Sequence, residues 1–187
     1  MSTLHCSLLS LGCVFGFTPP NQHTTLSGLR ALKIAQRRLR PEVRAKLLSV
    51  SSARSNGNLV PDAWRFVFQD LATSDHCRVV TVAAKASSEH PDTVEAFSSL
   101  KGENVAEFLP IPQNKLLVDS DQALEQARKS SKLKGIKGVE FRLVQPGSGR
   151  EPYWQLHFYA EGKDPVATVQ VGAKSGAVEL TPDLATA

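Results

Sequence analysis

Basic side chains that could bind an anionic partner are concentrated in residues 30–54. This segment contains eight basic residues against one acidic residue, Glu42. The eight are Arg30, Lys33, Arg37, Arg38, Arg40, Arg44, Lys46 and Arg54. On a helix, four of them share one face and form the candidate binding face: Arg30, Lys33, Arg37 and Arg40. A face of this kind can lie in solvent, contact the headgroups of a membrane or contact nucleic acid.

All three interpretations of this basic face stay open. A solvated helix face is the commonest arrangement. A membrane contact ranks second, because the apolar N-terminal stretch that precedes the helix would bring it to a bilayer surface. Nucleic acid ranks last, since the segment has neither interleaved aromatic residues nor a helix-turn-helix pairing.

No set of residues matches a known catalytic or metal-binding pattern. The sequence contains no GxSxG, P-loop, GxGxxG or HExxH motif. The five histidines share no metal-ligand spacing, and Asp119 and Asp121 are placed to complement a helix N-terminus. Trp64 and Trp154 are expected to anchor the core. We therefore expect no catalytic residues, no metal, no cofactor and a protein that is not an enzyme.

Composition is otherwise that of an ordinary globular chain. The 187 residues carry a formal net charge of +4, yet residues 55–187 hold more acidic than basic side chains. No apolar run reaches the roughly 18 residues that span a bilayer, so a transmembrane fold is not expected. The three cysteines are too few for a disulfide scaffold or a zinc module.

The first 23 residues are expected to be a leader-like or disordered apolar extension. The run from Leu4 to Phe17 has the length of a signal-peptide core, although no basic residue precedes it. Residues 10–13 weakly resemble a lipoprotein cleavage site, which leaves lipidation at Cys13 open. We expect the protein to be periplasmic, secreted or membrane-anchored, with a cytoplasmic location as the alternative.

The remaining sequence predicts one order of elements twice. A helix over 27–40 precedes strands over 46–52, 63–69 and 78–84, and a helix beginning at Ser120 precedes strands over 138–144, 153–159 and 165–171. A short helix is expected over 92–100, within the connection. Pro41 is expected to end the first helix.

The two halves also match residue by residue. Residues 31–35 correspond to 123–127 at an offset of 92, 63–68 to 153–158 at an offset of 90, and 81–85 to 170–174 at an offset of 89. Three matched elements in the same order predict a duplication. The expected fold class is α+β, with two duplicated units, each a helix packed on a three-stranded antiparallel sheet. The expected units are residues 24–87 and 119–187, joined by residues 88–118.

This pattern resembles the PepSY domain. The resemblance is best over 120–180, where the strand Tyr153–Phe158 precedes the closing turn 171–178, and looser over 27–87. The family usually has an Asp in that turn, where this sequence has Gly172. The resemblance implies a PepSY- or cystatin-like fold and a non-catalytic role in the bacterial envelope or exterior. It also implies a partner that is an envelope protein or a secreted protease.

Three functions from different classes are thus expected or open. The first is an exported or cell-envelope protein-binding module with an inhibitory or chaperone-like role. The second is a cytoplasmic nucleic-acid-binding protein that acts through residues 30–54. The third is a carrier that holds a small molecule or lipid between helix and sheet.

Overall fold

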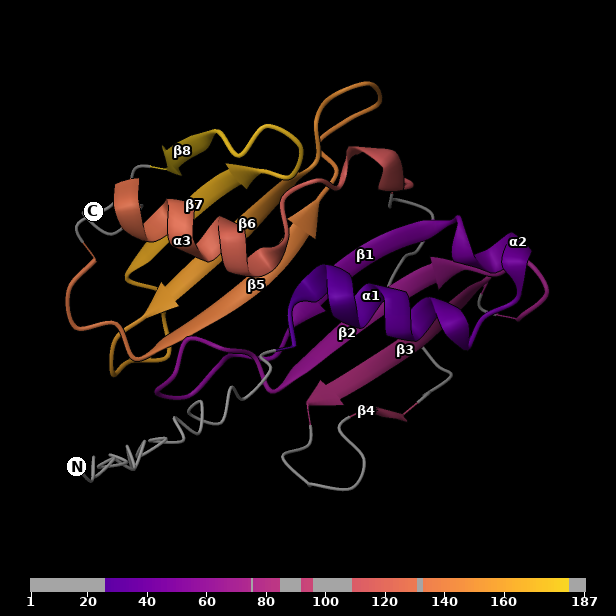
Figure 1. Cartoon of the computed structure of the whole chain (residues 1–187), viewed down its shortest axis with the longest axis horizontal. Coiled ribbons are helices and arrows are strands. Elements are labelled where there is room, and N and C mark those ends of the chain that lie inside the picture. Colours follow the sequence, from indigo (N-terminus) through magenta and orange to yellow (C-terminus); the bar gives the residue numbers. More distant parts are fainter. Residues whose placement is uncertain (1–25, 75, 85–91, 96–108, 131–132, 182–187) are drawn as a thin grey trace, which may run out of the picture.

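The computed structural model describes residues 26–74, 76–84, 92–95, 109–130 and 133–181. The predicted N-terminal extension lies outside the described residues. In chain order the elements are α1 (Gly28–Arg37), α2 (Pro41–Arg44), β1 (Leu47–Ser52), β2 (Ala63–Gln69), β3 (Cys77–Ala84), β4 (Asp92–Glu95), η2 (Gln113–Lys115), α3 (Ser120–Ser130), β5 (Gly138–Val144), β6 (Tyr153–Tyr159), β7 (Ala167–Gly172) and β8 (Val178–Thr181) (Figure 1). None of the described helices has the length and apolar character needed to pass through a membrane.

The strands form one continuous antiparallel sheet in the order β4-β3-β2-β1-β5-β6-β7-β8. The α+β class is therefore confirmed, but the expectation of two units with separate three-stranded sheets is wrong. The two halves join where β1 pairs with β5, with Val50 opposite Leu143 and Ser51 opposite Arg142. Beyond this pairing, the buried hydroxyls of Ser52 and Ser55 accept hydrogen bonds from backbone N–H groups of β5, at 3.0 and 2.9 Å.

Residues 92–95 form a strand, so the helix predicted over 92–100 is wrong in the part that the structure describes. β4 pairs with the outer edge of β3, with Val94 opposite Val82 and Thr93 opposite Ala83. An unpaired edge strand exposes a row of backbone donors and acceptors, and a segment that pairs with it satisfies them. The backbone hydrogen bonds formed with β3 stabilise this short segment more than an isolated helical turn would.

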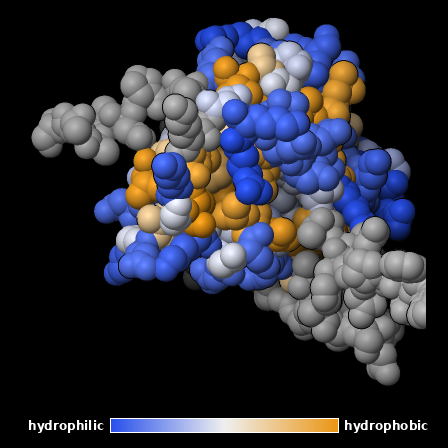
Figure 2. Space-filling view, turned by 60° about the vertical axis from the view of Figure 1, so that its left-hand side comes forward, coloured by the Kyte–Doolittle hydropathy of each residue, from blue (hydrophilic) through white to orange (hydrophobic). Residues whose placement is uncertain are grey.

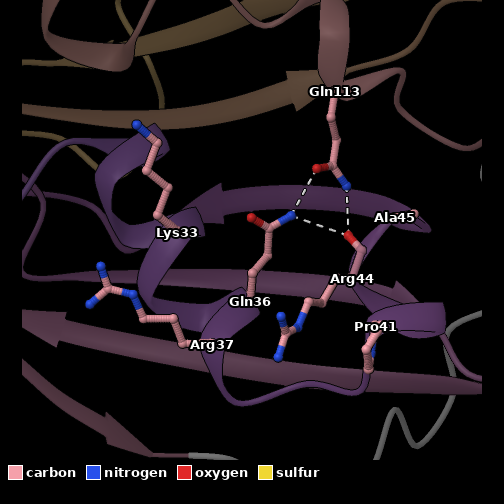
Figure 3. Close-up of a pocket in the computed structure, with 7 residues that line it drawn as sticks. All are labelled: Lys33, Gln36, Arg37, Pro41, Arg44, Ala45 and Gln113. Carbon is pink, nitrogen blue, oxygen red and sulfur yellow. Dashed lines mark hydrogen bonds between the residues drawn. The ribbon is translucent and has the colours of Figure 1, made fainter.

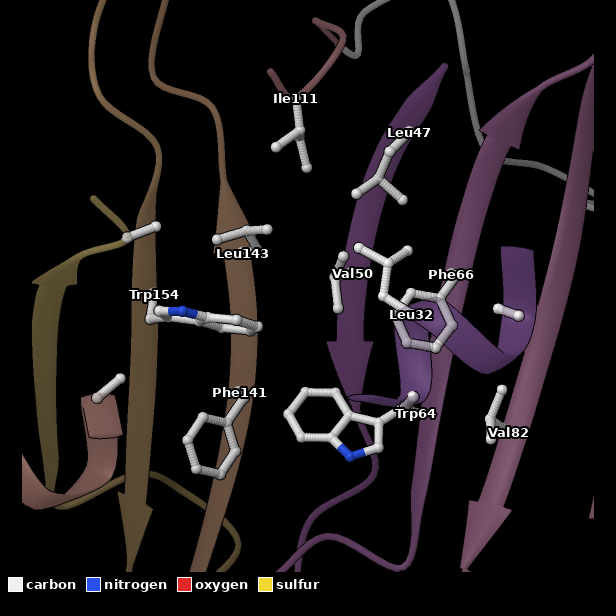
Figure 4. Packing of buried hydrophobic residues seen from close by; sticks show 14 of the residues in the cluster. Leu32, Leu47, Val50, Trp64, Phe66, Val82, Ile111, Phe141, Leu143 and Trp154 are labelled. Carbon is white, nitrogen blue, oxygen red and sulfur yellow. The ribbon is translucent and has the colours of Figure 1, made fainter. Parts of the chain in front are cut away.

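Both α1 and α3 pack on the same face of the sheet, and the core lies beneath them (Figure 1). Trp64 and Trp154 are fully buried there, which confirms them as core anchors. Their rings meet edge to face at 6.0 Å between centroids, and Phe141 packs against both (Figure 4). Each indole N–H also has a partner, because Trp64 donates to Leu26 O and Trp154 to Val118 O, both at 2.8 Å.

The N-terminus of α1 is held by the residues that begin α3. The Asp119 carboxylate accepts hydrogen bonds from the Ser27 hydroxyl at 2.6 Å and from Leu29 N at 2.8 Å. The Ser120 hydroxyl accepts one from Gly28 N at 2.8 Å. A carboxylate here satisfies free N–H groups and complements the helix dipole. The expected role of Asp119 at a helix N-terminus is thus confirmed. Its carboxylate accepts hydrogen bonds at the start of α1, in the other half, as well as from Ser120 N at the start of α3.

Candidate functional site

The basic side chains of the first half lie on its surface, over α1 and α2. Along α1, the residues Ala31, Leu32 and Ala35 are buried against the sheet, which places Arg30, Lys33 and Arg37 on the opposite, exposed side. Pro41 begins α2, as expected of a residue that ends one helix and starts the next, and α2 carries the exposed Arg44. We call Arg30, Lys33, Arg37 and Arg44 the cationic face.

Arg40, the fourth residue of the predicted binding face, is held in an ion-pair network. Its guanidinium lies 2.9 Å from the buried carboxylate of Asp70 and 3.5 Å from Glu42. Arg78 contacts the other Asp70 oxygen at 3.1 Å. Burial alone would raise the pKa of Asp70, but the Ala72 N–H and the two guanidinium groups outweigh it and lower that pKa. Arg40 therefore fixes the start of α2 to the turn that follows β2.

Between α1 and α2 the cationic face contains a shallow hollow of about 470 Å³ (Figure 3). The residues that line it are Lys33, Gln36, Arg37, Pro41, Arg44, Ala45 and Gln113. Three of these side chains are cations, and none of the described lining residues is acidic. With a group of positive charges and no carboxylate to neutralise them, the hollow favours an anion.

A set of amide hydrogen bonds gives this hollow a fixed frame. Gln36 donates to Gln113 Oε1 at 2.8 Å and to Arg44 O at 3.2 Å, and Gln113 donates to the same carbonyl at 2.7 Å. The Arg44 Nε–H donates to Leu39 O at 2.6 Å. Three segments of the chain are thereby tied together around the hollow, and Figure 3 shows the two amides meeting at Arg44.

Arg44 and Gln113 were absent from the predicted binding face. Arg44 lies beyond Pro41, which breaks the helical periodicity that selected the other residues. Gln113 comes from the connecting segment, far along the chain. Arg44 belongs to the basic segment 30–54, so its charge was a signal that could have identified it. The sequence gives no such signal for Gln113.

The face of the sheet that α1 and α3 do not cover carries a second hollow, of about 620 Å³, whose charged residues differ from those of the first. Its lining includes Arg65, Glu140, Arg142 and Gln155. Here Arg142 lies 2.9 Å from the Glu140 carboxylate, which also accepts a hydrogen bond from the Tyr159 hydroxyl at 3.0 Å. A carboxylate thus pairs with one of the two arginines in this hollow, so it offers an anion less than the cationic face does.

Other titratable groups near this face have structural surroundings. Burial lowers the pKa of His157, whose Nδ1 lies 3.1 Å from the Thr168 hydroxyl. Burial and the bond to Glu140 raise the pKa of Tyr159. Arg54 stacks over the Tyr159 ring, 4.1 Å from its centroid. Across the described part of the chain, no group of three or more His, Cys, Asp or Glu residues is placed to hold a metal ion.

The turn that carries the PepSY resemblance is held by a carboxylate from another hairpin. Glu151 Oε1 accepts hydrogen bonds from Lys174 N at 2.8 Å and Ser175 N at 2.6 Å. A Cβ at Gly172 would lie 2.6 Å from that oxygen and would also contact Ser175 Oγ, so a larger residue there would force these side chains to shift. The bond from Ser175 N, the largest influence, lowers the pKa of Glu151. This carboxylate stabilises the turn.

Hydrophobic surface offers no competing site of comparable definition among the described residues. In Figure 2, hydrophobic residues reach the surface in separate patches among hydrophilic ones. The large exposed hydrophobic residues among those described are Leu71, Leu109, Leu117 and Val166, which come from three separate regions of the chain. Single exposed residues of this kind are normal on a folded protein.

No known protein family, curated protein or solved structure matches the chain.

Proposed function

We propose that the protein is a non-enzymatic binding module of a divergent, PepSY-like type, which takes an acidic segment of a partner protein on its cationic face. It acts in the cell envelope or outside the cell. One observation carries the proposal: α1 and α3 occupy equivalent places on the sheet, yet only α1 presents an exposed surface of cations alone.

A comparison of the exposed residues of α1 and α3 separates the charges that a helix needs to pack on this sheet from those that point to a function. At the offset of 92, Arg30 and Lys33 correspond to Gln122 and Glu125. Arg37 corresponds to Lys129, which lies 2.6 Å from the Glu125 carboxylate. A mixed surface therefore suffices for a helix on this sheet. Because cations on one surface repel one another, a purely cationic one is best explained by a partner of opposite charge.

Equivalent internal contacts support the PepSY-like, duplicated origin of the two halves. The two tryptophans occupy matched strands, and each donates its indole N–H to the carbonyl two residues before a helix. A repeated buried contact of this kind is expected when two copies of one unit diverge while their core is retained.

Binding of a fluorescent polyglutamate peptide to the full chain tests the proposed function. The double variant Lys33→Glu/Arg37→Glu should weaken binding about tenfold or more, because two charge-assisted contacts become repulsive. The matched control is Arg128→Glu/Lys129→Glu on α3, which makes the same change in net charge and should have little effect. Equal losses in both variants would show that net charge alone governs binding and would contradict the proposal.

Nucleic acid is the second candidate, because its phosphate backbone is also a polyanion that the cationic face could contact. A duplex DNA or RNA that binds with a steep fall in affinity as salt rises, while polyglutamate does not bind, would establish this alternative. No observation favours a carrier, since the described space between helices and sheet is packed with Trp64, Phe141 and Trp154.

A further inference from the structure

The hollow between α1 and α2 differs from the rest of the cationic face because three cationic hydrogen-bond donors line it together. Lys33 and Arg37 extend from α1, and Arg44 comes from α2 (Figure 3). Neither Lys33 nor Arg37 makes a hydrogen bond or ion pair with another described residue. Both side chains are exposed and can therefore turn toward a ligand.

Arg44 has a different role because it is already anchored. Its Nε–H donates to Leu39 O, which holds the guanidinium in place while its terminal N–H groups can meet a ligand. The amides of Gln36 and Gln113 fix the Arg44 backbone from the other side. The hollow thus combines one held guanidinium with two adjustable cations.

We propose that this hollow binds a phosphate group, either free or carried by a phosphorylated side chain of the acidic partner. The inference rests on the proposed function and narrows its ligand. A carboxylate carries one negative charge, whereas a phosphate monoester carries close to two at neutral pH and presents three acceptor oxygens. Two guanidinium forks and an ammonium match that charge and that number of acceptors better than they match a carboxylate.

The remainder of the cationic face then has a separate task. Arg30 lies one helical turn before Lys33 and does not line the hollow. It would contact a carboxylate beside the phosphate, whereas Lys33 and Arg37 contribute both to affinity for acidic chains and to preference for phosphate. The ratio of the affinities for phosphate-bearing and phosphate-free ligands therefore tests the inference apart from the proposed function.

The experiment compares two peptides with the full chain: a glutamate-rich peptide containing one serine, and the same peptide phosphorylated at that serine. The phosphopeptide should bind at least about tenfold more tightly. In Lys33→Gln/Arg37→Gln this advantage should fall to about twofold or less. Arg128→Gln/Lys129→Gln on α3 removes the same number of positive charges, so it is the matched control and should retain the advantage. Circular dichroism melts should show all three proteins folded.

Each outcome decides one of the two ideas. Equal affinity for the two peptides, or an advantage that survives in Lys33→Gln/Arg37→Gln, overturns the phosphate site and leaves the binding of acidic partners standing. Inorganic phosphate and tripolyphosphate, titrated alone, distinguish the sources. If these bind through Lys33 and Arg37 while neither peptide binds, the site is supported with free phosphate as its ligand, and the proposed protein-binding function fails.

Discussion

The two halves of this protein use one architecture for surfaces of different charge. Both place a helix over a four-strand meander, and both bury a tryptophan beneath that helix. On α1 the exposed charged residues are all basic, whereas α3 carries the acidic Asp121 and Glu125 followed by the basic Arg128 and Lys129, and Glu125 pairs with Lys129. Packing therefore determines the buried residues of each helix but leaves the outer residues free to differ. This difference is the reason that we propose the first half as the binding half.

The largest expected effect tests whether the halves are equivalent inside. Trp64→Ala and Trp154→Ala should each lower the free energy of unfolding by about 3–5 kcal/mol, because each removes a fully buried indole from the same core. Urea denaturation measures both. Losses that differ by more than about 2 kcal/mol would show that the core depends mainly on one half.

A smaller effect is expected where the halves differ inside, at Gly28 and its equivalent Ser120. A Cβ at Gly28 would lie 2.8 Å from Trp154 Cη2 and 3.1 Å from Trp64 Cη2. Gly28→Ala should therefore destabilise the protein by about 1–3 kcal/mol, although alanine is the better helix former. Ser120→Ala, which removes the acceptor for Gly28 N, should cost about 1 kcal/mol. A stabilising Gly28→Ala in thermal melts would contradict the close packing.

Adding positive charges to α3 tests the comparison between the two helices in the opposite direction. Gln122→Arg/Glu125→Lys gives α3 the cations that Arg30 and Lys33 supply on α1. This variant should bind polyglutamate a few-fold more tightly than the native chain but show no added preference for the phosphopeptide, because no equivalent of Arg44 is present there. Titration of both peptides measures this. An added phosphate preference would mean that helix charge alone is enough.

The smallest effect concerns pH, and it compares Asp70 in the first half with Glu151 in the second. Both carboxyls have a pKa below the usual value, so each stabilises the fold above its unfolded pKa and loses that contribution as pH falls through the folded one. Glu151→Gln should flatten the loss of stability below about pH 4.5 by less than about 1 kcal/mol, since its partners lie near solvent.

Asp70→Asn is the comparison for that measurement. Asp70 is buried and contacts two arginines, so it should account for the larger share of acid sensitivity. Melting temperatures between about pH 3 and pH 7 would test the order. A larger flattening in Glu151→Gln than in Asp70→Asn would reverse the expected ranking.

Local patterns in the sequence were enough to predict most elements and both core tryptophans. Alternation in strands 63–69 and 153–159 and the stripe of Ala31, Leu32 and Ala35 depend on neighbours in the chain. The join between β1 and β5 depends instead on serines that bond a distant backbone, and serine is also a common loop residue. No local periodicity reports such a contact.

The candidate site was predictable only in part for the same reason. The helical periodicity of α1 selected Lys33 and Arg37 correctly as exposed cations. It also selected Arg40, since charge pattern cannot reveal that a buried Asp70 lies within reach. The hollow itself depends on Gln36 and Gln113, which meet only after the connection has brought η2 beside α2.

The cap that Asp119 and Ser120 provide to α1 has a consequence for synthesis of the protein. A ribosome makes α1 long before it reaches residue 119, so the nascent first half emerges with its helix start and the indole of Trp64 still awaiting partners. Its native form becomes available only after β5 and β6 have also left the exit tunnel. Until then the apolar residues of the first half lack some of the partners that bury them, a state that is prone to aggregation.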